Sequence, residues 1–240
     1  NAGDGAAVVV DAGPEPDSID GCLDRLDVQQ VPVVVLTHFH DDHVAGLPGV
    51  AAGREVGELL VSPTPDPPGG AAAVRSWTES ESVRSTVPAF GATGTVGQVS
   101  WQVVGPARAV EGASWGEEGS AANNASLVLV AVVRGVRILL TGDIEPEAQE
   151  LLDRATTDLR VDVLKVPHHG SRYQDPAFLA GLGARLAVVS AGEGNDYGHP
   201  APATLAVLED AGAMVRRTDQ DGDVAVVVDD QDDLEVVTRG

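Results

Sequence analysis

The chain has 240 residues, a formal net charge of −22 at pH 7 and 43% hydrophobic residues. This composition is globular rather than disordered, and the negative charge opposes nonspecific binding to nucleic acid or anionic lipid. The single cysteine excludes an internal disulfide, and no apolar run approaches the roughly 18 residues of a membrane span. An acidic substrate therefore needs a local positive feature, such as metal ions or a few arginines.

Apolar runs alternate with helical patterns along the first half of the chain. The run VPVVVLTH at residues 31–38, for example, predicts a buried strand. In chain order the pattern predicts a strand over 6–13, a helix over 18–26, strands over 31–38 and 58–63, a helix over 69–80 and a strand over 99–106. Residues 110–124 form the longest stretch without a pattern, and long loops in compact domains are often functional.

The second half opens with a predicted hairpin at residues 126–143, whose two strands meet at Arg134 and Gly135. The pattern continues with a helix over 146–154, a strand over 161–167, a helix over 175–183, a strand over 185–190, a helix over 202–212 and strands over 213–218 and 223–230. Strands and helices mixed in this way predict two sheets, each covered by helices. We expect residues 1–240 to form one domain and to be a piece of a longer protein.

The histidines of the chain fall into three places, each after a predicted strand. They are His38, His40 and His43, then His168 and His169, and then His199. Loops at one end of a sheet gather functional groups there. We therefore expect the three places to contribute to one site.

The densest of these places is THFHDDH, residues 37–43. Its H-x-H-x-D-H spacing sends two histidines to one side and the pair Asp42 and His43 to the other, an arrangement that suits two metal ions. Imidazole nitrogens favour transition metals, and a carboxylate adds negative charge. The alternative, a polar loop with chance histidines, explains the density of the pattern poorly.

Two further places are less specific when taken alone. Asp143 in TGD follows a predicted buried strand, where an aspartate is usually a helix cap. Beside a two-metal cluster it becomes a candidate bridging ligand, because a carboxylate has two oxygens. His199 in YGHP is as compatible with a surface loop as with a metal site.

Together these motifs resemble the metallo-β-lactamase-fold hydrolases. Asp11 in VDAG, the HFHDDH run and TGD at Asp143 carry the general resemblance. Within that superfamily, LLTGDIEPEAQELL, DVLKVPHHGS and YGHP resemble the C-terminal domain of the ComEC family of bacterial competence proteins, the DNA-uptake channels. The resemblance runs from residue 3 to about residue 228.

The resemblance implies an α/β fold, a four-layer αββα sandwich with two divalent metal ions, zinc or manganese, at the sheet edges. One ion would take His38 and His40, the other Asp42 and His43, and Asp143 would bridge them. Asp11 would orient the first loop rather than bind metal.

One departure from the superfamily pattern concerns the residues before the strand that precedes TGD. Many members carry a further metal-binding histidine there, whereas this chain has Asn123 and Asn124. We expect one of the adjacent pair His168 and His169 to replace it. We favour His169 as the ligand and His168 as the catalytic residue facing the substrate, with the reverse assignment left open.

The remaining ligand and substrate contacts follow from this assignment. His199 would then complete the second metal site. Asn124, Ser171, Lys165 and Tyr197 are candidate substrate contacts, as is Arg172, although a structural role competes for each of the last four. Catalysis would involve His168 and Asp42, with His168 protonating the leaving group or binding a phosphoryl oxygen.

The function that the resemblance implies is a metal-dependent phosphodiesterase, a nuclease acting on DNA, with a single strand as the expected substrate. The domain would work in DNA uptake at the extracytoplasmic face of the bacterial cell membrane, beside the rest of a membrane-embedded channel and without inserting into the membrane itself. Two alternatives remain. One is a small-molecule hydrolase such as a phosphocholine esterase or lactonase, and the other is a metal-stabilised binding module without turnover.

Overall fold

The structure is a computed structural model that describes residues 1–107, 120–228 and 234–239. The chain divides into two compact units, Asn1–Val128 and Leu129–Gly240. Most of the stretch at 110–124, which carried no pattern, lies outside the described residues. Its end, Ser120–Asn124, is a short helix, α5.

The first unit contains a parallel sheet and four helices before α5. Its elements are β1 (Ala6–Val10), α1 (Pro16–Arg25), β2 (Gln30–Leu36), α2 (Asp41–Val44), α3 (Leu47–Val50), β3 (Glu55–Val61), α4 (Pro68–Glu81), β4 (Arg84–Thr86), β5 (Thr93–Val96) and β6 (Val99–Gly105). The sheet has the order β1-β2-β3-β4 with every neighbouring pair parallel, and β5 and β6 form an antiparallel pair.

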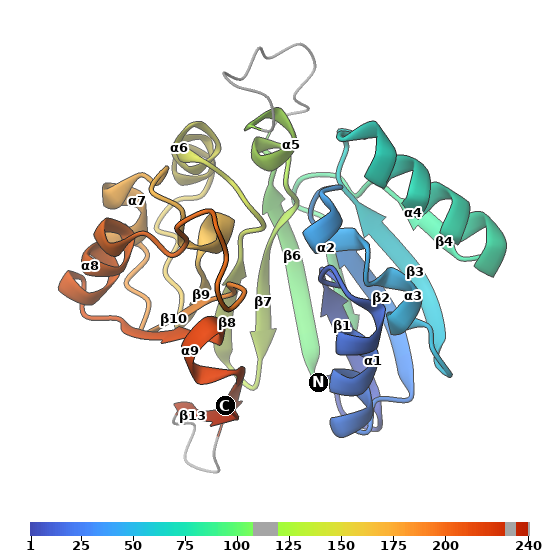
Figure 1. The fold of residues 1–240 in the computed structure, drawn as a ribbon. Helices are drawn as coiled ribbons and strands as arrows, with labels where there is room; N and C mark the ends of the chain where they lie inside the picture. The colour runs from blue at the N-terminus through green and yellow to red at the C-terminus, as the bar shows by residue number, and fades with distance from the viewer. Residues whose placement is uncertain (108–119, 229–233, 240) are drawn as a thin grey trace. The chain divides into compact units, whose positions relative to one another are not determined.

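One buried apolar cluster joins this parallel sheet to its helices. It contains Val34 and Leu36 of β2, Leu23 of α1, Leu47 of α3 and Val74 of α4, among others. Figure 1 shows α1, α2 and α3 beside the strands that they cover. Because the strands are parallel, their carboxyl ends lie at one edge of the sheet, and the loops that follow β1, β2 and β3 begin there.

The second unit is built around a mainly parallel sheet. Its elements are β7 (Val128–Val133), β8 (Val136–Leu140), α6 (Pro146–Ala155), β9 (Val163–Lys165), a 3₁₀ turn η1 (Pro167–Gly170), α7 (Pro176–Gly181), β10 (Leu186–Val189), α8 (Pro202–Asp210), β11 (Met214–Arg217), α9 (Thr218–Asp221), β12 (Asp223–Val228) and β13 (Leu234–Arg239). The strand order is β11-β10-β9-β8-β7, with the neighbours from β8 to β11 parallel and β7 antiparallel to β8.

The terminal hairpin of β12 and β13 covers part of this sheet. Val226 and Val236 of the hairpin pack against a buried cluster of Val136, Val163 and Leu186. Helix α8 packs on α7 and on β11, as Figure 1 shows. Because β8, β9 and β10 are parallel, their carboxyl ends lie at one edge of this sheet, as in the first unit.

The elements predicted from sequence are present, but the structure differs from the prediction at several places; α9 and β13, for example, were not predicted. The HFHDDH run is not only a loop, because Asp41–Val44 forms the single turn α2, followed at once by α3. The predicted strand over 161–167 is confined to Val163–Lys165, and Pro167 opens the turn η1. Short strands without a clear alternation, such as β4, could not be recognised from the pattern.

Candidate metal centre

Asp11 organises the loop that follows β2 in the first unit. One carboxylate oxygen accepts the Thr37 backbone N–H at 2.8 Å, and the other accepts the Thr37 hydroxyl at 2.9 Å. The second oxygen also lies 2.8 Å from Nδ1 of His43. Asp11 has a left-handed backbone at φ 57°, a conformation that aspartate tolerates better than most residues. These contacts fix where the histidine motif begins.

The electrostatics of Asp11 follow from the same contacts. Burial alone would raise the pKa of this carboxyl. The charge and hydrogen bond of His43, the charge of His38 and the Thr37 N–H outweigh burial, so that the pKa of Asp11 lies below its usual value. The carboxylate is therefore ionised at neutral pH and can hold the proton on Nδ1 of His43.

His38, His40, Asp42 and His43 are the first set of candidate ligands, and both ring nitrogens of His38 and of His43 have a defined neighbour. Nδ1 of His38 lies 3.2 Å from the Thr37 hydroxyl, and Nε2 of His38 lies 2.9 Å from Nδ1 of His40. Nε2 of His43, the nitrogen opposite the one held by Asp11, lies 3.6 Å from Oδ2 of Asp42. The His38 ring lies 4.7 Å from the His40 ring and 4.0 Å from the His43 ring, centroid to centroid. The pairing of His38 with His40 and of Asp42 with His43 on separate ions stays a prediction.

A second hydroxyl also faces His38. The Ser126 Oγ lies 3.4 Å from Nδ1 of His38, and the backbone N–H of Leu127 donates to the Thr37 carbonyl at 2.8 Å. Asn124, a candidate substrate contact, is buried at the end of α5, two residues before Ser126. The resemblance implies a further histidine in this segment in many superfamily members. In this chain the segment instead supplies the Ser126 hydroxyl, which faces Nδ1 of His38.

Asp143, His169 and His199 are the second set of candidate ligands, and they lie on the loops that follow β8, β9 and β10 of the second unit. Nε2 of His169 lies 3.2 Å from Oδ2 of Asp143, and Nδ1 of His169 lies 2.7 Å from the Ser190 carbonyl at the end of β10. Asp143 is not a helix cap, because the residue at the start of α6 is Glu145. The carboxylate and the imidazole instead face one another.

The two adjacent histidines can point to different partners because the backbone turns sharply. His168 and His169 both have left-handed backbones, at φ 48° and 52°, and Gly170 follows at φ 76°. Histidine is among the residues enriched in this region. Nδ1 of His168 lies 3.3 Å from Oε1 of Glu145, whereas His169 turns to Asp143.

Glu145 was not predicted as a site residue from sequence. It occupies the position before α6, where an acidic residue normally caps the helix, but its side chain makes no capping hydrogen bond. It is buried and lies beside His168. The available signal was its place two residues after Asp143, on the same loop.

Lys165, the only lysine of the sequence, also lies beside Asp143. Its Nζ lies 3.3 Å from Oδ1 of Asp143 and donates to the Gly142 carbonyl at 3.2 Å. These contacts favour a structural role for Lys165 beside Asp143. The two oxygens of Asp143 thus face different partners, Oδ1 the ammonium and Oδ2 the His169 imidazole.

The loop that carries His199 and Tyr197 is closed by Asn195. The Asn195 side chain donates to the His199 carbonyl at 2.7 Å and accepts the His199 N–H at 3.2 Å. Burial, together with the charges of His168 and His169, lowers the pKa of His199, although Asp143 opposes the shift. His199 is therefore neutral at pH 7, as a metal ligand must be.

Ser171 stands apart from the other sequence-predicted contacts. It is fully buried, and its hydroxyl accepts the Tyr173 backbone N–H at 3.2 Å. Its carbonyl accepts the Thr204 hydroxyl at 2.7 Å. These contacts favour a structural role, in which Ser171 holds the HHGS turn against α8.

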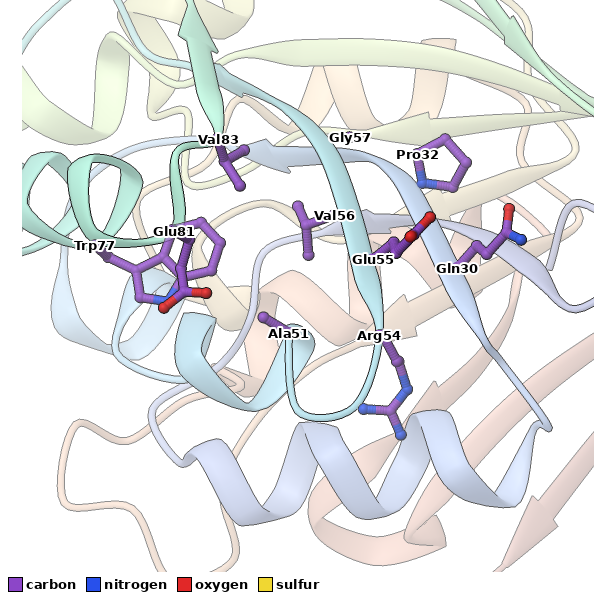
Figure 2. A pocket seen from close by; sticks show the side chains of 10 residues that line it. All are labelled: Gln30, Pro32, Ala51, Arg54, Glu55, Val56, Gly57, Trp77, Glu81 and Val83. Atoms are coloured by element: carbon purple, nitrogen blue, oxygen red, sulfur yellow. The ribbon is translucent and has the colours of Figure 1, made fainter.

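One hollow on the first unit lies away from the histidines. It has a volume of about 480 Å³, and its lining includes Gln30 and Pro32 at the start of β2 and Trp77 on α4 (Figure 2). His38 follows the opposite end of β2. No histidine lines the hollow, so it is separate from the histidine motif.

The contacts of three histidines meet the requirements of a metal site. In His38, His43 and His169, Nδ1 faces a hydroxyl, a carboxylate and a backbone carbonyl respectively, and Nε2 lies within 3.6 Å of another candidate ligand atom. Metal-binding histidines in proteins are normally oriented in this way. The residues of each unit therefore fit a divalent metal ion.

Comparison with known proteins agrees with this chemistry. The family model of the metallo-beta-lactamase superfamily matches residues 2–175. The chain belongs to this superfamily. Its members are generally hydrolases that bind divalent metal ions, and the mixed α/β fold class predicted from sequence is confirmed.

Two curated relatives are competence proteins. The chain is 39% identical over 103 residues to ComE operon protein 3 of Bacillus subtilis and 34% identical over 102 residues to competence protein ComA of Neisseria gonorrhoeae. Each alignment covers 42% of this chain but only 13% and 15% of the respective relatives. The predicted resemblance to competence proteins is confirmed for this segment.

A solved structure supports the fold independently. Zn²⁺-bound PqqB from Methylobacterium extorquens matches with a TM-score of 0.56 at 18% identity, over 87% of this chain and 80% of that one. Within the ranges that the structure describes, no helix combines the length and the apolar character that crossing a bilayer requires.

Proposed function

We propose that this superfamily member is a binuclear metal-dependent phosphodiesterase, a nuclease that acts on DNA during natural transformation. The observation that carries the proposal is the orientation of the three histidines. His38, His43 and His169 are each held at Nδ1, with Nε2 directed at another candidate ligand atom. The similarity to two competence proteins supports the choice of DNA as substrate.

The proposed metal ligands come from both units, as the superfamily resemblance implies. His38 and His40 would hold one ion, and Asp42 and His43 the other. Asp143 would bridge the two, with His169 completing the first site and His199 the second. The metals are zinc or manganese, because a mixed set of imidazole and carboxylate ligands accepts either.

When bound, the two ions would supply an activated water and neutralise negative charge on the phosphoryl group. The chain's own contribution centres on His168. The Glu145 carboxylate lies 3.3 Å from Nδ1, and its negative charge would favour a proton on that nitrogen. Nε2 of His168 would then hold a phosphoryl oxygen or give a proton to the leaving oxygen.

Lys165 would keep the bridging carboxylate in place. Its ammonium contacts Oδ1 of Asp143 and the Gly142 carbonyl, two groups of the loop after β8. A cation there compensates part of the negative charge of Asp143, which is almost fully buried. Lys165 thus acts on the substrate only through Asp143.

The cellular setting of the proposal comes from the relatives. The domain would act outside the cytoplasmic membrane, as part of a membrane protein, on a DNA strand delivered by the rest of an uptake channel. Delivery matters because the net charge of −22 disfavours capture of DNA by the general surface of the chain.

The direct test is cleavage of labelled single- and double-stranded DNA by the purified chain with Mn²⁺ or Zn²⁺. We expect cleavage that EDTA abolishes and that the Asp42→Asn variant lacks. Asp41→Asn is the matched control, because Asp41 is the exposed neighbour of Asp42. DNA that stays intact with every metal, or is cleaved equally by Asp42→Asn, would reject the nuclease.

A second candidate is a small-molecule phosphodiesterase or lactonase, which the charge of −22 favours because such substrates need little electrostatic capture. Turnover of bis(p-nitrophenyl) phosphate, phosphocholine esters and lactones by the same preparation separates the two. Rapid turnover of one small substrate together with intact DNA would favour this candidate.

A further inference from the structure

Both tyrosines of the chain flank the histidines of the second unit. Tyr173 follows the HHGS turn and Tyr197 precedes His199, and their side chains are 52% and 85% exposed. Aromatic residues make up only 3% of this chain. Exposed rings next to candidate catalytic histidines offer a contact surface for a ligand with flat faces.

Tyr197 continues a series of rings that leads to the proposed catalytic residue. The Tyr197 ring lies 6.0 Å from the His199 ring, centroid to centroid, and is tilted by 30° from it. The His199 ring lies 5.4 Å from that of His168. Asn195 closes this loop on both backbone groups of His199 and so holds the backbone next to Tyr197.

Arg172 places a positive charge beside the exposed Tyr173 ring. The Arg172 guanidinium lies 5.2 Å from the centroid of the Tyr173 ring, and its Nη2 donates to the Tyr173 hydroxyl at 3.4 Å. A guanidinium stacked on an aromatic ring keeps donors for phosphate recognition. The buried Ser171 hydroxyl holds the Tyr173 N–H and so anchors this pair to the turn.

We propose that Tyr197 forms a stacking platform for the bases of single-stranded DNA beside His199 and His168, and that Tyr173 and Arg172, which follow the HHGS turn, provide a second contact for the same strand. The proposal rests on the proposed function and names how the strand is held. Stacking suits a chain with a charge of −22, because it does not depend on attraction to phosphates. The acidic neighbour Asp196 also disfavours a phosphate at Tyr197, which leaves the base as the contacting group.

The test measures binding rather than cleavage. The metal-loaded chain is titrated into fluorescent oligothymidine with phosphorothioate linkages, which resist hydrolysis, and into the same backbone with abasic sites. We expect oligothymidine to bind more tightly than the abasic strand. Tyr197→Ala should lower the ratio of the two affinities by about tenfold, since one stacked base contributes about 1–3 kcal/mol. Tyr197→Phe should retain the ratio.

Two controls make the result specific. Phe90→Ala removes another exposed aromatic ring, in the first unit, and should not change binding. Duplex DNA should be indifferent to Tyr197→Ala, because its bases are stacked on one another. Metal content and thermal unfolding of each variant establish that the fold and the metal site are intact.

Several outcomes would overturn the platform. They are equal binding of the two strands by the unmodified chain, no measurable binding of either, unchanged binding by Tyr197→Ala, or an equal loss for duplex DNA. Failure of the nuclease proposal is distinguishable. DNA that is bound through its bases but never cleaved would support the platform and reject the nuclease. Cleavage that is independent of Tyr197 would support the nuclease and reject the platform.

Discussion

The two units assemble their ligand sets in different ways. The first unit places His38, His40, Asp42 and His43 within six residues, on the loop after β2 and on the single turn α2. The second unit carries Asp143, His169 and His199 on the separate loops that follow three strands, β8, β9 and β10. A short motif can therefore be read along the chain, whereas the dispersed set exists only because parallel strands end at one edge of a sheet.

The backbone conformations of the histidines also differ between the two units. The histidines of the first unit have ordinary conformations, and Asp11, which contacts His43, has the left-handed one. In the second unit His168 and His169 are themselves left-handed. Such residues persist only where the surroundings fix them, and they gather at functional sites. The second unit thus depends more strongly on its packing to present its ligands.

The strongest test asks whether the two sets serve one centre. Asp42→Asn and Asp143→Asn each change one carboxylate to an amide of similar size, one in each unit. We expect both to lower hydrolysis by about a thousandfold, since metal catalysis contributes several kcal/mol. The double variant should be as active as the less active single variant, because the effects of residues that act as a unit are not additive. Full activity of Asp143→Asn would mean that the first set works alone.

The adjacent histidines provide the next test, by steady-state kinetics and metal analysis. Asparagine is the suitable replacement, because it tolerates the left-handed backbone. His169→Asn should lose metal, whereas His168→Asn should keep metal and lose about a hundredfold in kcat, the range of general acid catalysis. The reverse pattern would exchange the two assignments, and an effect of neither would remove both.

Asp11 should matter for metal affinity rather than for the reaction itself. Asp11→Asn keeps a side chain that accepts φ 57° but removes the charge facing His43. We expect metal affinity to fall by about 10- to 100-fold in a chelator competition assay, as for other residues that orient ligands. Asp41→Asn is the control and should bind metal normally; equal affinity of the two variants would contradict the role of Asp11.

The smallest expected effect concerns packing in the second unit. A Cβ on Gly170 would lie 2.7 Å from Cβ of Pro200, and Gly170 has φ 76°. Gly170→Ala should therefore lower the free energy of unfolding by about 1–3 kcal/mol in denaturant titrations. Gly181→Ala, where a Cβ would meet no atom within 4 Å, is the control. A Gly170→Ala variant as stable as this control would show that the turn adapts.

The sequence by itself determined the element types, the H-x-H-x-D-H motif and the superfamily. Strands such as β2 are continuous apolar runs that pack on both faces, and the motif follows one of them directly. Helix α2 could not be predicted from the sequence, because a single helical turn has no periodicity to detect. Nothing in the sequence distinguishes Glu145 from an ordinary helix cap.

Only the tertiary structure decided which atoms face one another. Strand pairing places Ser190, the residue after β10, beside His169, so that a backbone carbonyl, which the sequence does not reveal, fixes the ring. The pairing of β8 with β9 likewise brings Lys165 to Asp143 across 22 residues of chain. These contacts depend on register between distant segments, which local residue patterns do not encode.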